Sequence, residues 1–343
     1  MVSPRLSVVV VTYNCREDIA RTLQALADQL AEGDELLIID NASSDGTPDA
    51  AEAAAPAATV IRGRENLGFA AGANLGAARA TGDLLLFLNP DAVPAPGFVE
   101  AIAAPLRDGR DWAAWMGLVT AEDGRIVNTS GGVVHFTGMA WAGEHGRPAA
   151  EVAPEPREVG FVSGACLAVP RERWLEAGGF SEHYFMYCED VDLSLRLRLA
   201  GGRIGVEPRA RVDHDYEFAT GAAKLRLLER NRWATLIRTY PLPLLLLVTP
   251  ALLTAELALL AVAAAGGWGR QKLLAWADVV ARLPRLLAER RRIQARRRVG
   301  SGVIADWLVP ELSSPFLGRV AESRLVGALL RGYWRLVLLA LRA

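Results

Sequence analysis

The sequence predicts an α/β fold, with a mostly parallel, Rossmann-like sheet flanked by helices and a helical C-terminal region after it. Three observations support this prediction. Short apolar runs alternate with helix-like stretches over the first ninety residues, long apolar segments begin after Tyr240, and the charge balance reverses between the two parts. The length of 343 residues and the apolar share of 51% suffice for one large domain with a second region beside it.

Four short, unbroken apolar runs predict strands that are buried on both faces of a parallel sheet. They lie at 6–11, 36–40, 59–62 and 84–88. Helix-like stretches separate them, with apolar residues three or four apart or with many alanines, at 19–30, 48–55 and 70–80. Alternation of this kind is typical of α/β sheets, which bind ligands at the carboxyl ends of their strands.

After residue 93 the sequence pattern is less regular, and fewer elements can be predicted. The stretch 94–157 is rich in Gly and Pro and less regular. Beyond it we expect a buried strand over 160–169, helices over 171–177 and 189–200, and a strand over 204–206.

Charge and cysteine content limit the class of protein. The formal net charge of −1 argues against a nucleic-acid partner, although it conceals 18 Lys/Arg against 32 Asp/Glu in 1–223 and 20 against 7 in 224–343. Three cysteines without a CxxC spacing argue against a disulfide framework and a structural zinc site. The N-terminus lacks the pattern of a cleaved signal peptide, so we expect the acidic part in the cytosol.

Polar residues stand where the predicted strands end, and a further acidic pair opens the predicted helix at 189. Because the carboxyl ends of parallel strands meet at one edge of a sheet, a shared function is favoured over isolated turn formers. These residues are Thr12, Tyr13, Asn14, Asp40, Asn41, Asn89, Asp91, Glu189 and Asp190.

The chemistry of this set suits a nucleotide-sugar. Asp40 can accept a hydrogen bond from a ribose hydroxyl or a base N–H. Asp91 can hold Mg²⁺ or Mn²⁺ against a pyrophosphate, since these ions prefer oxygen ligands, and the metal would offset charge as a nucleoside diphosphate leaves. A carboxylate of the Glu189–Asp190 pair can take the proton of an attacking hydroxyl.

Five stretches carry a family resemblance over about the first 200 residues. They are SVVVVTYN at 7–14, LLIIDNASSDGT at 36–47, NLGFAAGANLGAARATGDLLLFLNPDA at 66–92, GFVSGACLAVPR at 160–171 and GFSEHYFMYCEDVDLSLRLRLAG at 179–201. In this order they resemble the inverting family 2 glycosyltransferases of the GT-A fold, and among these the rhamnosyltransferase-like branch that builds bacterial surface polysaccharides.

The resemblance implies a role for each matching position. Asp190 is the expected catalytic base, with Glu189 as its neighbour at the acceptor. Asp91 is the expected metal-binding acid of a DxD-type motif whose first acid is Asn89 in this chain. The expected donor-binding residues are Thr12, Tyr13, Asn14, Asp40, Asn66, Gly68, Asn74, Asn89 and Asp91.

The resemblance also implies a divalent metal cofactor, Mg²⁺ or Mn²⁺, with His214 as a second ligand. Imidazole binds such metals, but Asp213 and Asp215 are alternative ligands, and an ordinary hydrogen-bonded histidine is the other interpretation.

We expect residues 1–223 to form the catalytic domain, with the nucleotide-sugar part at about 1–92 and the acceptor part at about 93–223, and residues 224–343 to form a basic, apolar helical tail. The segment 242–265 is long enough to cross a bilayer, yet a single crossing would place the arginines of 282–298 outside, against the positive-inside tendency. We therefore favour a hairpin or interfacial helices on the cytoplasmic membrane surface. The alternative is a soluble subdomain that packs on the catalytic domain or on a second subunit of a homo-oligomer.

The segment 229–233 allows two interpretations. Arg230 and Arg232 face a pyrophosphate or anionic lipid, or they belong to a basic helix face with Trp233 packed in a core.

The predicted reaction is a single displacement that moves a sugar from a nucleotide-sugar donor, with dTDP-rhamnose as the first choice, to a saccharide or lipid-linked saccharide. The catalytic domain would act at the cytoplasmic face of the membrane. The alternatives are a processive polysaccharide synthase and a non-catalytic nucleotide-sugar-binding scaffold protein.

Overall fold

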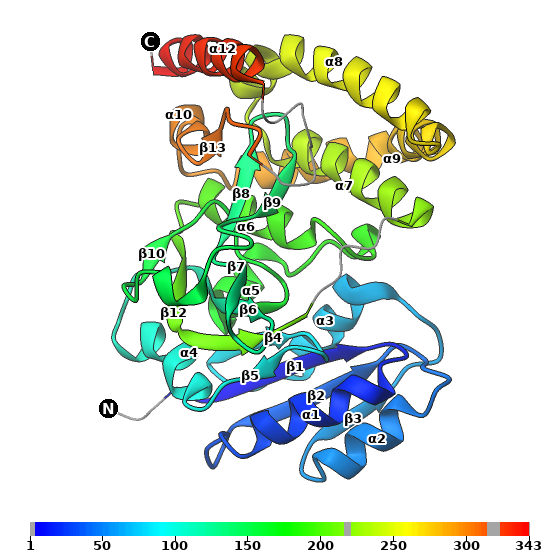
Figure 1. Ribbon diagram of the computed structural model, residues 1–343, viewed down its shortest axis with the longest axis vertical. Coiled ribbons are helices and arrows are strands. Elements are labelled where there is room, and N and C mark those ends of the chain that lie inside the picture. The colour runs from blue at the N-terminus through cyan, green and yellow to red at the C-terminus, as the bar shows by residue number, and fades with distance from the viewer. Residues whose placement is uncertain (1–3, 216–220, 314–322, 343) are drawn as a thin grey trace. The chain divides into compact units, whose positions relative to one another are not determined.

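The computed structural model describes residues 4–215, 221–313 and 323–342 (Figure 1). The chain divides into two compact units. Among the described residues, the first unit holds 4–132, 142–197 and 202–215. The second unit holds 133–141, 198–201, 221–313 and 323–342.

The first unit is built on a mixed sheet. Its strands run in the order β10-β12-β6-β11-β4-β1-β2-β3, with β5 beside β12 and β7 beside β6. The pairs β1–β2, β1–β4, β2–β3 and β6–β12 are parallel, and the other pairs are antiparallel. The strands are β1 Leu6–Thr12, β2 Glu35–Asp40, β3 Thr59–Arg62, β4 Leu84–Leu88, β5 Val93–Pro94, β6 Ala114–Ala121, β7 Ile126–Thr129, β10 Arg157–Glu158, β11 Cys166–Pro170 and β12 Ile204–Asp213.

Helices cover both faces of this sheet. Figure 1 shows α1 and α2 on one side of β1–β3 and α3 on the other. This arrangement follows from right-handed crossovers, because the chain moves outward from β1 to β3 and then returns to β4 on the far side of β1. The helices are α1 Arg16–Ala27, α2 Thr47–Ala54, α3 Gly68–Arg79, α4 Phe98–Arg107, α5 Arg171–Ala177 and α6 Glu189–Leu199.

The central strands match their apolar sequence. Every residue of β4 is fully buried, and β1 is buried along its whole length. The predicted strands at 6–11, 36–40, 59–62 and 84–88 are confirmed, together with the three helices that separate them. The expected burial on both faces is wrong for β3, because this strand lies at the edge of the sheet and its residues are exposed or half-buried.

Three predicted elements differ from the structure. The strand expected over 160–169 is reduced to β11, because the backbone of Gly164 donates to a side chain of α6 instead of to a neighbouring strand. The strand expected over 204–206 extends to Asp213, because it also pairs with the later residues of β6 and with β5. The less regular stretch contains α4 and the buried strand β6.

The second unit is mainly helical. Its helices are α7 Ala222–Thr239, α8 Leu242–Ala265, α9 Gly269–Ala295, α10 Ser301–Ala305 and α12 Arg324–Arg342. A small sheet, β13-β8-β9, joins Leu308–Val309 to the hairpin of Gly132–His135 and Ala140–Ala142. Helix α8 continues through Pro250, packs against α9 and α12, and is the described helix whose length and composition suit a membrane crossing.

Four buried charges join α7, α8 and α9, and we call them the ion cluster: Glu229, Arg232, Glu256 and Lys272. Arg232 donates to Glu229 at 3.0 Å and also pairs with Glu256. Lys272 lies 2.8 Å from Glu256 and pairs with Glu229 as well. Two carboxylates thus meet two cations, and this matching of opposite charges is the condition under which buried charges are tolerated.

The ion cluster overturns both sequence interpretations of Arg232. The side chain is buried, and its remaining donor contacts the carbonyl of Thr137 at 2.9 Å, so it faces neither a pyrophosphate nor lipid in this structure. It is also no part of a solvated basic face. Arg230 is buried too, and it donates to Asn231 at 2.8 Å.

Gly76 tests how closely α3 packs on β1. A Cβ at this position would lie 2.3 Å from Cγ1 of Val9. Gly76→Ala should therefore lower the free energy of unfolding by about 1–3 kcal/mol, because overpacking outweighs the better helix propensity of alanine. Gly332→Ala is the control, since it lies in a helix with open space around it and should not destabilise the protein. Calorimetric melting measures both, and equal effects of the two changes would contradict the predicted contact.

Candidate active site

The ends of β1 and β2 are joined through Asp40. Thr12 lies opposite Asp40 in the parallel pair and donates from Oγ1 to its carboxylate at 3.0 Å. Ser43 donates from its hydroxyl at 2.5 Å and from its backbone N–H at 2.9 Å. Thr12 and Asp40 are both buried, so the carboxylate fixes the loop that follows β2.

Asn14 shapes the same edge of the sheet. Its backbone is left-handed, with φ +49°, and its N–H donates to the Ser43 hydroxyl at 2.9 Å. Its side-chain oxygen accepts from the N–H of Ser44 at 2.9 Å. The neighbouring Tyr13 is 51% exposed. These contacts bring the loops after β1 and β2 together, and Tyr13 stands open at their edge.

Gly68 begins α3 at the point where this edge meets a later loop. Asn66 accepts from the N–H of Gly68 at 2.9 Å, and Asn41 donates to the Gly68 carbonyl at 3.2 Å. Gly68 has φ +84°, and a Cβ there would lie 2.5 Å from the Phe185 ring and carbonyl. Only glycine permits both this backbone conformation and this close approach.

The loop before the acidic pair carries unusual backbone geometry. Phe185, Tyr187 and Cys188 have φ values of +66°, +70° and +64°. Left-handed conformations cost free energy in residues other than glycine and persist where the surroundings hold them. One such restraint is the hydrogen bond from the Ala70 N–H to the Phe185 carbonyl, at 3.1 Å.

Asn74 holds the start of this loop from the side of α3. Its amide nitrogen donates to the Phe180 carbonyl at 2.9 Å and to Glu182 at 3.1 Å. Its amide oxygen accepts from the N–H of Phe180 at 2.9 Å. The amide nitrogen and the amide oxygen of Asn74 thus both form hydrogen bonds within the protein. Its predicted contact with the donor stays a prediction.

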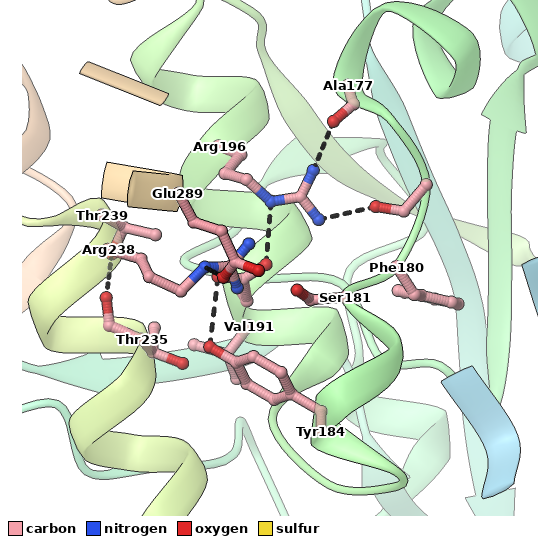
Figure 2. A network of polar contacts seen from close by, with 12 residues as sticks. Ala177, Phe180, Ser181, Tyr184, Val191, Arg196, Thr235, Arg238, Thr239 and Glu289 are labelled. Carbon is pink, nitrogen blue, oxygen red and sulfur yellow. Dashed lines mark hydrogen bonds and ion pairs between the residues drawn. The ribbon is translucent and has the colours of Figure 1, made fainter. Parts of the chain in front are cut away.

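A buried ion pair in α6 holds the loop from the other side. Arg196 donates to Asp192 at 2.8 Å and to the carbonyls of Ala177 and Gly179 at 2.7 Å each (Figure 2). The Tyr184 hydroxyl donates to the second oxygen of Asp192 at 3.2 Å. The segment 177–184 is therefore fixed to α6 by charge-assisted hydrogen bonds that water barely reaches.

Glu189 and Asp190 begin α6 directly after the loop. Asp190 keeps part of its surface open and accepts from the backbone N–H of Gly164 at 3.0 Å and of Val191 at 2.8 Å. Glu189 is buried, and its Oε2 has no hydrogen-bond partner among the described residues.

Burial and the nearby Asp190 carboxylate raise the pKa of Glu189 well above its usual range. Burial also raises the pKa of Asp190, although the N–H groups of Gly164 and Val191 oppose this shift. The pair therefore keeps its last proton on Glu189, and Asp190 is the member that ionises first. An oxygen without a hydrogen-bond donor, as in Glu189, favours the neutral form.

Asp91 and His214 come together at the other end of this edge. Nε2 of His214 lies 3.0 Å from Oδ1 of Asp91. Burial raises the pKa of Asp91, but the hydrogen bond and charge of His214 outweigh this, and the pKa is lowered. His214 is fixed through its backbone, which donates to the Thr120 carbonyl at 2.8 Å and accepts from Asn128 at 2.9 Å.

Asp213 and Asp215, the two alternative metal ligands, accept hydrogen bonds from other groups. Asp213 accepts from the Thr120 hydroxyl at 3.0 Å and from the N–H of Gly124 at 2.9 Å. Asp215 accepts from the N–H of Glu122 at 2.7 Å. Of the three neighbours, His214 is thus the one whose side chain contacts Asp91.

Backbone contacts connect the metal-binding candidates to the acidic pair. The N–H of Asn89 donates to the Ala165 carbonyl at 3.0 Å, and the adjacent Gly164 donates to Asp190. Asp91 follows Asn89 by two residues. The metal-binding candidates and the Glu189–Asp190 pair therefore lie along one edge of the sheet.

Known proteins share this architecture. The family model described as "Glycosyl transferase family 2" matches residues 7–171. An N-acetylglucosaminyl-diphospho-decaprenol L-rhamnosyltransferase of Mycobacterium tuberculosis is 31% identical in an alignment of 238 positions that covers 63% of this chain and 78% of that protein. The chain is a family 2 glycosyltransferase. It is also similar to rhamnosyltransferase WbbL of Escherichia coli, 41% identical over 56 residues, which are 16% of this chain and 21% of that protein.

Solved structures confirm the GT-A fold. A mannosyltransferase from Pyrobaculum calidifontis in complex with GDP-Man and Mn²⁺ aligns with a TM-score of 0.52 and 20% identity over 86% of each chain. GalNAc-T7 with UDP, GalNAc and Mn²⁺ aligns with a TM-score of 0.57 and 17% identity over 70% of this chain, which spans about half (48%) of that one. Both likenesses concern the fold.

Sequence reasoning missed the residues that support the loop, namely Tyr184, Asp192 and Arg196. One signal was present, since Asp192 and Arg196 are four apart on a helix, where opposite charges attract. Their burial and their contacts with 177–179 carry no periodic signal.

Gly68→Ala tests whether the loop position matters for transfer in this family 2 enzyme. The new Cβ should displace Phe185 and lower turnover by roughly 10–100-fold, the effect of a small misplacement of reacting groups. Gly97→Ala is the matched control, with φ +80° but nothing within 4 Å, so it should cost stability alone. Nucleoside diphosphate release measures turnover. Equal losses in both variants would show that backbone strain, and not Phe185, is responsible.

Proposed function

We propose that this glycosyltransferase inverts configuration while moving rhamnose from dTDP-rhamnose to a hydroxyl of a lipid-linked saccharide, at the cytoplasmic face of the membrane, in the synthesis of a cell-surface polysaccharide. The observation that carries the proposal is the single edge on which Asp190, held by two backbone N–H groups, and the Asp91–His214 pair both lie. An acid–base group and a metal-binding pair are the two functions that displacement of a nucleotide requires.

The donor end fits a divalent cation that a nucleotide helps to hold. Asp91 and His214 supply one carboxylate oxygen and one imidazole nitrogen, and Asn89 replaces the first acid of the motif. No cluster of three or more His, Cys, Asp or Glu residues suited to a metal occurs in the part of the chain that the structure describes. A pair of this kind suits Mg²⁺ or Mn²⁺ that completes its shell with phosphate and water. Bound there, the ion would offset charge on the diphosphate.

The loops after β1 and β2 support the nucleotide proposal. Asp40 and Asn14 orient backbone and hydroxyl groups of Ser43 and Ser44 through the hydrogen bonds described above. Tyr13 is exposed beside them, so its ring is free to contact a base. We assign Thr12, Tyr13, Asn14 and Asp40 to the nucleotide, and Asn66, Gly68 and Asn74 to the sugar side.

At the acceptor end, Asp190 takes the proton of the attacking hydroxyl. It can do so because it ionises before Glu189 and because two N–H groups orient its carboxylate. Glu189 stays neutral beside it, which avoids a second negative charge next to the Asp190 carboxylate.

The substrates are proposed from the relatives. The mycobacterial relative is named for transfer of L-rhamnose to N-acetylglucosaminyl-diphospho-decaprenol. A lipid-linked acceptor also agrees with a C-terminal unit that carries a long apolar helix. We therefore place the acceptor at the cytoplasmic membrane surface.

The acidic pair gives a prediction with a matched control. Asp190→Asn should lower turnover by about 10²–10⁴-fold, the usual contribution of a general base, while donor binding is kept. In the wild-type enzyme turnover should fall with acid at a pH above the usual aspartate pKa of about 3.9, because burial raises the pKa of Asp190.

Glu189→Gln copies a protonated Glu189. The acid limb of its pH–rate profile should therefore stay where the wild-type enzyme has it. A limb that moves to lower pH would mean that Glu189 is charged in the working enzyme. Near-normal turnover of Asp190→Asn would remove Asp190 as the base.

A screen of nucleotide-sugars by thermal shift tests the donor end. With Mn²⁺ present, dTDP-rhamnose should raise the melting temperature more than UDP-glucose or GDP-mannose, since ligand at a hundredfold excess over its Kd stabilises by about 2.7 kcal/mol. Asp91→Ala should lose the metal-dependent part of the shift, and the exposed Asp28→Ala should keep it. A shift that is the same in both variants would contradict the role of Asp91.

A further inference from the structure

The second unit carries an apolar surface, and we infer that it binds anionic bilayers in a defined orientation. We propose that α8 lies in the plane of the membrane surface, with the exposed leucines of α8 and α12 in the acyl region and arginines at the phosphates. The inference deepens the proposed function, because it says how the enzyme reaches a lipid-linked acceptor. Its test uses neither donor nor acceptor.

Helix α8 has two opposite faces. The face packed within the unit carries Leu244, Val248, Leu252 and Glu256, all buried. The opposite face is a leucine stripe, with exposed fractions of 57% for Leu242, 62% for Leu246, 60% for Leu253 and 71% for Leu257. These four positions fall on one side of a helix with 3.6 residues per turn.

Helix α12 repeats this arrangement and lies against α8, as Figure 1 shows at the C-terminal end of the chain. Trp334 and Val337 are its buried contacts. Its exposed leucines, at 65–71% exposure, again share one side of the helix and are Leu325, Leu329, Leu336 and Leu339. A row of exposed arginines runs beside them at 324, 331, 335 and 342. Leucines next to arginines along a helix are typical of interfacial helices.

The ion cluster argues against a crossing by α8. Glu256 lies in the middle of the helix and contacts Arg232 of α7 and Lys272 of α9. The Trp276 indole donates to the same carboxylate at 2.8 Å. A spanning α8 would have to withdraw Glu256 into lipid and leave Arg232 and Lys272 buried without it, and both separations are unfavourable. The cluster therefore ties α8 to polar helices that stay outside the bilayer.

Charge identifies the partner. Residues 224–343 hold 20 Lys/Arg against 7 Asp/Glu, and exposed arginines stand in the last turns of α9, at 291 and 292, and directly after it, at 296, 297 and 298. A second copy of this unit would bring the same excess of positive charge to the interface and be repelled. An anionic lipid surface offers both negative charge and an apolar interior, so it satisfies leucines and arginines together.

Flotation of the purified full-length chain with lipid vesicles tests the proposal. The chain should float with vesicles of phosphatidylcholine and phosphatidylglycerol, and far less with phosphatidylcholine alone. Leu253→Asp with Leu257→Asp, and Leu329→Asp with Leu336→Asp, should each weaken binding by about tenfold or more. Leu175→Asp is the matched control, because this leucine is 58% exposed on α5 of the catalytic unit and should not matter.

Three outcomes would overturn the proposal: wild-type protein that fails to float with either vesicle, aspartate variants that float like wild type, or a dimer in buffer that the aspartates dissociate. Circular dichroism and melting show whether each variant folds. If the aspartate variants do not fold, charge reversal of the exposed Arg331 and Arg335 to Glu replaces them and should remove the preference for anionic vesicles.

Labelling distinguishes an in-plane helix from a crossing. Ala265 is exposed at the end of α8, just before the turn into α9. With protein added to the outside of vesicles, Ala265→Cys should react with an impermeant maleimide as completely before detergent as after it. Glu172→Cys, exposed on α5, is the control. Reaction of Ala265→Cys only after detergent would show a crossing and would leave the proposed glycosyl transfer unaffected.

Discussion

The buried pairing of Arg196 with Asp192 is the interaction on which the candidate active site depends. A guanidinium out of water must be fully hydrogen-bonded, and Arg196 meets this demand through one carboxylate and the carbonyls of Ala177 and Gly179. Those carbonyls belong to the segment that leads into the left-handed residues Phe185, Tyr187 and Cys188. Glu189 and Asp190, at the start of α6, therefore follow a loop that their own helix holds in position.

The same loop links the two ends of the site. Asn74 and Gly68 of α3 contact it from one side, and Asp192 and Arg196 of α6 contact it from the other. Strained backbone conformations persist where the surroundings hold them, and here the contacts come from both helices.

In the second unit, buried charges likewise hold a helix in position. Glu256 alone would make α8 a poor core helix and a poor membrane span. Paired with Arg232 and Lys272, it becomes an attachment that orients the helix and presents leucines outward. In the first unit the Arg196–Asp192 pair, and in the second unit the ion cluster, consist of charged side chains that are buried next to opposite charges. Each set of contacts fixes the position of the element that carries it.

The sequence by itself determined the strands β1 to β4, the helices between them, the polar residues at strand ends and the separation of acidic from basic parts, because apolar periodicity and turn chemistry are local properties. Only the tertiary structure decided that His214 and not Asp213 contacts Asp91, that Arg232 is buried, and that 160–165 leaves the sheet. Each of these depends on hydrogen-bond partners many residues away. Buried polar groups take whichever partner the folded chain brings within reach, and no pattern along the sequence specifies that partner.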